Sequence, residues 1–140
     1  MKTLSFILIL ISFSSFAQLD QKQVDSLLTR LSQLSQDTNR VKILIILGNS
    51  YNQFDTEKAI KFHKEAVELS EKLNYKWGLS RSTTALGWTY MWGRNYVKAV
   101  EYSQKALTMI DSSDVNVVRY WTTLGALALV YKNIGDNERA

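Results

Sequence analysis

The stretches TTALGWTY, at residues 83–90, and AVEYSQKA, at residues 99–106, decide the fold of this 140-residue chain. The second stretch begins and ends with alanine, and the same alanine spacing occurs upstream at Ala59 and Ala66. Each pair of alanines follows a segment in which Leu-Gly precedes a tyrosine by two intervening residues. Self-similarity with a period of about 20 to 50 residues is typical of solenoids built from repeated helix pairs. The sequence therefore predicts a repeat protein.

Small residues predict where the two helices of each repeat meet. Antiparallel helices approach closely only where side chains are small, so we expect Gly48, Gly87 and Ala128 to lie opposite the first alanine of the following helix, at Ala59, Ala99 and Ala140. The segment from Leu44 to Ala66 is one residue shorter than that from Thr83 to Ala106, which predicts a tighter first turn. The residues expected to pack the repeats are Leu47, Gly48, Tyr51, Ala59, Ala66, Leu86, Gly87, Tyr90, Ala99, Ala106, Ala128, Tyr131 and Ala140.

The predicted fold class is all-α, a solenoid of antiparallel helix pairs with about two and a half repeats. Proline is absent and glycine occurs only six times, which argues against the turn-rich sequence of a β-sandwich. A lead helix within residues 18–36 is indicated by an apolar stripe, and it should cover the first repeat. The repeats follow over residues 37–140, at about 38–73, 75–111 and 114–140, the last incomplete. Expected helix N-caps are Asp37 or Thr38, Asp55, Asp114 and Asp136.

These spacings resemble the tetratricopeptide repeat, and the second copy matches its pattern at Leu86, Gly87, Tyr90, Ala99, Tyr102 and Ala106. The resemblance covers residues 38–140 and implies a right-handed superhelix. The family repeats every 34 residues, whereas Tyr51, Tyr90 and Tyr131 here are 39 and 41 residues apart. Such lengthened repeats behind an export signal look like the exported sensory regions of Bacteroidetes-type histidine kinases and transmembrane transcriptional regulators.

The resemblance also implies a concave groove lined by the first helix of each pair. Trp88 and Trp92 share one helical face there. Two interpretations are open: the tryptophans pack against the neighbouring helix, or they form a platform that grips an extended peptide or a partner helix. The carboxylate clamp of chaperone-binding members is matched only at Lys42 and Asn49, so that activity is not carried over. The implied groove residues are Lys42, Asn49, Asn52, Gln53, Arg81, Thr84, Trp88, Met91, Trp92, Thr122, Leu129, Lys132 and Asn133.

The first seventeen residues predict a signal peptide. Lys2 precedes an apolar run from Leu4 to Phe13, and Ser15 and Ala17 supply the small residues that a signal peptidase reads. Cleavage is expected between Ala17 and Gln18, which would place the mature chain in the periplasm or outside the cell. The run is shorter than the roughly 17 to 25 apolar residues of a membrane span, and no later segment is long enough. We therefore expect no transmembrane span after cleavage.

The composition excludes several kinds of chemistry. Without cysteine there is no disulfide, thiolate nucleophile or cysteine zinc site. The net charge of +4 comes from charges interspersed along helices, so no nucleic-acid partner is expected. His63 is the only histidine, and Lys64 follows it where kinase phosphoacceptors carry an acidic residue; we expect a partly exposed helix histidine. Asp111 and Asp114 lack the further oxygen ligands that calcium needs. No catalytic, cofactor or metal site is predicted.

The sequence thus favours an exported, non-enzymatic module that binds a peptide or protein segment in its concave groove. The alternative is the input region of a two-component histidine kinase or transmembrane transcriptional regulator, with its output domain beyond residue 140. The third helix pair stops at Ala140. An apolar face left open there is expected to make the chain self-associate.

Overall fold

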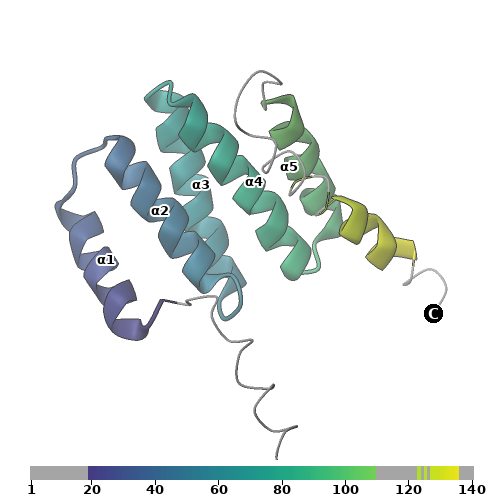
Figure 1. The fold of residues 1–140 in the computed structure, drawn as a ribbon, viewed down its shortest axis with the longest axis horizontal. Coiled ribbons are helices and arrows are strands. Elements are labelled where there is room, and N and C mark those ends of the chain that lie inside the picture. The colour runs from purple at the N-terminus through teal and green to yellow at the C-terminus, as the bar shows by residue number, and fades with distance from the viewer. Residues whose placement is uncertain (1–18, 110–122, 124, 126, 136–140) are drawn as a thin grey trace, which may run out of the picture.

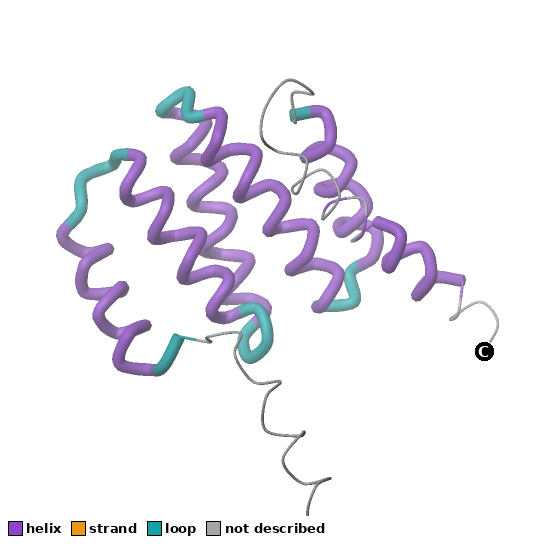
Figure 2. The backbone as a smooth tube through the Cα atoms, in the orientation of Figure 1, coloured by secondary structure: helices purple, strands orange, loops and turns teal. Residues whose placement is uncertain are grey.

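The computed structural model describes residues 19–109, 123, 125 and 127–135. Residues 1–17, Asp114, Thr122, Asp136 and Ala140, on which some of the expectations rest, lie outside this set. Within it no residue is in a strand (Figure 2), so the predicted all-α class is confirmed. Residues 127–135 are helical, and the helices before them are α1 (Gln21–Gln33), α2 (Thr38–Tyr51), α3 (Thr56–Lys72), α4 (Lys76–Trp92) and α5 (Tyr96–Thr108).

Local sequence signals set most of the helix starts. Asp37 Oδ1 accepts hydrogen bonds from the backbone N–H groups of Asn39 and Arg40, at 2.8 and 3.0 Å, which decides between the two predicted caps in favour of Asp37. Asp55 caps α3 as predicted. Asn95 caps α5, whereas α4 begins after Tyr75 without a side-chain cap. The starts of α2 and α3 therefore follow from the sequence alone.

The helices form a solenoid-like stack in which each packs against the next (Figure 1). Consecutive helices run antiparallel, so α2 and α4 run parallel to each other. Helix α2 also packs against α4, whereas α3 and α5 lie farther apart and are joined by an ion pair between Lys105 Nζ and Glu71 Oε1 at 4.0 Å. The row of helices therefore closes on the side of α2 and α4 and opens on the side of α3 and α5. The first helices of the repeats thus share one side of the molecule.

The two complete repeats use the same aromatic packing. Tyr51 stacks on Phe62 with 5.7 Å between ring centroids, and Tyr90 stacks on Tyr102 at 5.3 Å. In both repeats the residue before the first alanine is a lysine whose ammonium lies over the tyrosine ring, Lys58 at 4.1 Å and Lys98 at 5.3 Å from the centroid. Equivalent positions in the two copies therefore occupy equivalent environments.

The close helix approach falls one turn later than the sequence predicts. Ala59 and Ala99 are fully buried, but the residues nearest to the two glycines lie four positions further on. A Cβ placed on Gly48 would lie 2.3 to 2.8 Å from the His63 ring, and one on Gly87 would lie 2.7 Å from Ser103 Oγ. Residues four apart share a helix face, so the alanines mark the correct face but not the level of closest approach.

The prediction of a tighter first turn is wrong. Residues 52–55 connect α2 to α3, whereas only residues 93–95 connect α4 to α5. Helix α2 ends three residues after Gly48, two residues sooner than α4 ends after Gly87, and the turn after α2 is one residue longer, so the first copy is one residue shorter in total. Because α4 ends in a tight turn closed by a left-handed residue, Arg94 with φ 58°, its connection needs fewer residues.

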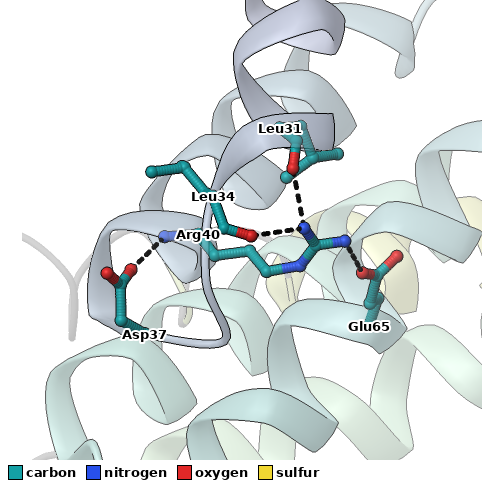
Figure 3. A network of polar contacts seen from close by, with 5 residues as sticks. All are labelled: Leu31, Leu34, Asp37, Arg40 and Glu65. Atoms are coloured by element: carbon teal, nitrogen blue, oxygen red, sulfur yellow. Dashed lines mark hydrogen bonds and ion pairs between the residues drawn. The ribbon is translucent and has the colours of Figure 1, made fainter.

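Arginine 40 attaches the lead helix to the first repeat (Figure 3). Its Nη1 donates to the Leu31 carbonyl at 2.7 Å, near the end of α1, and its Nη2 donates to Glu65 Oε1 of α3 at 3.0 Å. Val24 and Leu31 bury their side chains in the same core as α2. Among α1 to α5, the lead helix contacts α2 alone, so it covers the first repeat as predicted.

Within the third repeat, the described residues belong to its first helix. Val130 is buried in the core shared with α4 and α5, whereas Ala128 is exposed and Tyr131 is 53% exposed. The packing expected at Ala128 and Tyr131 is therefore not present among the described residues. In the described part of the chain no helix has the length and apolar character of a membrane span.

Candidate functional site

Helix α2 is buried except along one stripe. Its exposed residues after the first turn are Lys42, Ile46 and Asn49, and Gln53 continues the stripe just beyond the helix end. These positions are separated by three or four residues, which places them on one face. The stripe combines one cation and two amides with an apolar residue.

Helix α4 presents a matching stripe. It is formed by Trp77, Arg81, Ala85, Trp88 and Trp92, again at spacings of three or four residues, and nearly all other positions of α4 beyond its first turn are buried. Because α3, α5 and α2 all pack against α4, only one side of this helix remains open. We call the two stripes on α2 and α4 together the inner face.

The two predicted tryptophans lie together but in different environments. The ring centroids of Trp88 and Trp92 are 5.8 Å apart with their planes tilted by 45°. Trp88 is half-buried and packs against the core shared by α4 and α5, whereas Trp92 is 48% exposed. The two interpretations of the tryptophans are therefore compatible. Trp88 is held by the core, and it supports the solvent-exposed indole of Trp92.

Three of the predicted groove residues are wrong. Asn52, Thr84 and Met91 are only 6%, 8% and 4% exposed and point into the protein. Each is the sequence neighbour of a residue in one of the stripes, and a step of one residue along a helix turns the side-chain direction by about 100°. Lys42, Asn49, Gln53, Arg81, Trp88 and Trp92 do reach the surface of α2 and α4.

The inner face also contains residues that the sequence reading missed. Ile46 lies four residues after Lys42, Trp77 lies four before Arg81, and Ala85 lies four after Arg81. Helical spacing from the two predicted cations would have found all three. In the third copy, Leu129 and Lys132 are exposed and Asn133 is half-buried. Leu129 occupies the repeat position of Asn49 and Trp88.

A buried polar chain links the helices beneath the inner face. The Thr89 hydroxyl donates to Asn52 Oδ1 at 2.6 Å, and His63 Nδ1 lies 3.1 Å from Thr89 Oγ1. With the hydroxyl proton directed to Asn52, the imidazole donates from Nδ1, and Nε2 is left without a proton or a hydrogen-bond partner in the described residues. The chain joins α2, α3 and α4 through three side chains.

The expectation of a partly exposed histidine is wrong, because His63 is fully buried. Burial lowers its pKa to about 4, and the backbone of Ile45 acts weakly in the opposite direction. The absence of a side chain at Gly48 makes the space that the ring fills. A sequence pattern for α3 alone does not reveal that space, since it is created by another helix.

The site offers surface contacts, with no chemical group poised for reaction among those the structure describes. His63 is enclosed and cannot reach a molecule bound on the inner face. In the described residues no three His, Cys, Asp or Glu side chains gather in a way that could hold a metal ion. Comparisons with family models, with curated proteins and with solved structures found no significant match.

Proposed function

We propose that this protein is a non-enzymatic interaction module that holds an extended peptide or protein segment against the inner face. The observation that carries the proposal is the tryptophan pair on α4, with Trp92 half exposed and Trp88 held by the core. Large aromatic residues at a surface provide much contact area for little loss of side-chain entropy. Their position beside the α2 stripe gives a bound segment a second helix to contact.

The setting of the tryptophans favours binding without rearrangement. Trp88 packs against the core and its ring lies 5.8 Å from that of Trp92, so Trp92 has a fixed neighbour and should lose little conformational freedom on association. Asn49 on α2 and Gln53 just beyond its end carry amides that can both donate to and accept from a peptide backbone. An apolar anchor with adjacent amides is the usual composition of a peptide-recognition surface.

Alanine substitution of Trp92 tests the proposal. The full chain is screened against an array of synthetic twelve-residue peptides, and binding of the selected peptides is followed by their fluorescence anisotropy. We expect Trp92→Ala to weaken binding at least about tenfold, in line with the loss of an aromatic hot spot. The melting temperature should change little because Trp92 lies outside the core.

Phe54 provides the matched control. It is an aromatic residue in the turn between α2 and α3, is 73% exposed and lies outside the inner face. Phe54→Ala should leave peptide binding unchanged. Equal binding by wild type and Trp92→Ala, or an equal loss with Phe54→Ala, would contradict the proposal.

Export is a further proposal, and it comes from the sequence of residues 1–17 alone. It predicts that the mature chain begins at Gln18. Mass spectrometry of the protein recovered from the cell envelope or the medium of the native host would identify that terminus. Recovery of a chain that retains Met1 would contradict cleavage.

A further inference from the structure

The inner helices α2 and α4 carry four basic residues, a net charge of +4, whereas the outer helices α3 and α5 carry six lysines and five glutamates, a net charge of +1. Helices α2 and α4 contain no Asp or Glu, whereas α3 and α5 carry all of the acidic residues found within the helices of the two complete repeats. The acidic residues of the outer helices are Glu57, Glu65, Glu68, Glu71 and Glu101. The basic residues of the inner helices are Arg40, Lys42, Lys76 and Arg81.

Three of the four inner cations are available to a ligand. Arg40 is occupied by Glu65 and by the end of α1. Lys42, Lys76 and Arg81 form no hydrogen bond or ion pair within the described residues. Lys42 acts electrostatically on Asp37, but the pKa of that carboxyl group is lowered chiefly by the backbone N–H of Arg40, and Lys42 contributes least of the causes. The Asp37 carboxylate already accepts two backbone hydrogen bonds.

Lys42 and Arg81 lie toward one end of the inner face and the Trp88–Trp92 pair lies toward the other, while the exposed Trp77 lies at the cationic end, four residues before Arg81. Lys42 and Arg81 each lie six residues before the glycine of their repeat, so they occupy the same level near the N-terminal ends of two parallel helices. The helix dipoles are positive at this end. Trp88 and Trp92 lie in the C-terminal half of α4. The inner face therefore has a cationic end, which also exposes Trp77, and an uncharged end that carries the Trp88–Trp92 pair.

The distance between the two ends sets a spacing in the ligand. Trp88 and Trp92 follow Arg81 by seven and eleven residues, or roughly 10 to 16 Å along a helix. An extended peptide advances about 3.3 Å per residue, so this distance corresponds to about three to five residues. We propose that the inner face selects an extended peptide with an acidic residue three to five positions from a large apolar residue. This inference rests on the proposed function and specifies its ligand class.

A set of labelled synthetic peptides tests the spacing. Ten-residue fluorescein-labelled peptides carry one Leu or Trp anchor and a pair of Glu residues about four positions from it. In half of the peptides the Glu pair precedes the anchor in the chain, and in the other half it follows. Matched peptides have Gln in place of Glu, or place Glu next to the anchor. We expect the full chain to bind the spaced Glu peptides about tenfold more tightly than the Gln peptides, and the difference to shrink in 0.5 M NaCl because exposed charges are screened.

Removing the two cations provides the complementary test. The Lys42→Gln, Arg81→Gln double variant should lose the preference for Glu, with the two peptide types binding within about twofold of each other. The control is Lys61→Gln with Lys64→Gln, two exposed lysines on the outer helix α3. This control should retain the preference.

The outcomes separate the two proposals. If the Gln peptides bind and lose affinity with Trp92→Ala, but Glu brings no gain, the proposed function stands and the acidic preference is overturned. An acidic preference that persists in the Lys42→Gln, Arg81→Gln variant would also overturn it. If no peptide in either series responds to Trp92→Ala, both proposals fail.

Discussion

The first helix pair, α2 and α3, surrounds an apolar core and one histidine, whereas the second pair, α4 and α5, buries many small and hydroxyl side chains. The buried apolar residues of α2 are Val41, Ile43, Leu44, Ile45 and Leu47. The buried hydroxyl residues of α4 are Ser80, Ser82, Thr83, Thr84 and Thr89. Both pairs nevertheless adopt the same arrangement. The repeat is thus defined by its small residues and stacked aromatics, while the remaining core positions accept different chemistry.

The hydroxyl groups of α4 are tolerated because the helix itself satisfies most of them. Ser82 donates to the Gly78 carbonyl at 2.7 Å and Thr84 to the Ser80 carbonyl at 2.9 Å. A buried hydroxyl with such a bond costs little, whereas one without a partner loses its hydration uncompensated. The second pair therefore gains less free energy from apolar burial than the first, but most of its buried polar groups are hydrogen-bonded.

The largest expected difference between the pairs is in their glycines. Gly48→Ala should lower the free energy of unfolding by about 3 kcal/mol, the upper end of the usual cost of overpacking, because the added methyl group would lie 2.3 to 2.8 Å from the ring of the fully buried His63. Gly87→Ala should cost only about 1 kcal/mol, since the Ser103 hydroxyl can rotate away and alanine is the better helix former. Urea denaturation of both variants measures the difference. Equal losses of unfolding free energy would show that the helix contacts at Gly48 and Gly87 are equally intolerant of an added methyl group.

Histidine 63 should make the first pair sensitive to acid. Below pH 6.5 the unfolded chain binds a proton that the folded chain does not accept until about pH 4. Stability therefore falls as the pH drops through this window, by about 3 kcal/mol in total, and is constant with respect to this group above pH 6.5. His63→Gln removes the titration. Comparing urea denaturation of the two proteins from pH 7 to pH 4 isolates it, and parallel pH profiles would contradict the burial of a neutral imidazole.

Threonine 83 tests the chemistry of the second core. It occupies the repeat position of Leu44, and its Oγ1 is buried without a hydrogen-bond partner among the residues that the structure describes. Thr83→Val keeps the shape and removes the unpaired hydroxyl, so it should stabilise the protein by about 1 to 2 kcal/mol. Thr84→Val, at a hydroxyl that is hydrogen-bonded to its own helix, is the control and should bring no gain. Thermal denaturation would show the contrast, and destabilisation by Thr83→Val would mean that the hydroxyl has a partner.

The smallest expected effect concerns the turns. Arg94 adopts a left-handed conformation, φ 58°, after α4, whereas the turn after α2 has no residue with positive φ. Glycine enters this region without steric cost, so Arg94→Gly should raise the free energy of unfolding by about 1 kcal/mol. Lys72→Gly, in the last turn of α3, is the opposite control and should be destabilising. A loss of stability with Arg94→Gly would indicate that the arginine side chain contributes more than its backbone costs.

The sequence predicted correctly what depends on neighbours along the chain. The helix starts at Asp37 and Asp55, the lead helix with its buried Val24 and Leu31, and the burial of Ala59 and Ala99 all follow from caps and helical periodicity. It also placed Lys42, Arg81 and Trp92 on the surface of the inner helices. The tetratricopeptide resemblance rests on these spacings.

Apart from the length of the first turn, the errors concern contacts between different helices. Periodicity shows which side of α2 carries Asn52, but only the position of Thr89 on α4 makes that side chain a buried hydrogen-bond acceptor. Likewise, His63 has the surroundings of a surface residue in its own helix, and the gap at Gly48 buries it. Caps and spacing are properties of one helix and can be read from the sequence. Burial at a helix interface depends on what the facing helix leaves empty, and only the tertiary structure decides that.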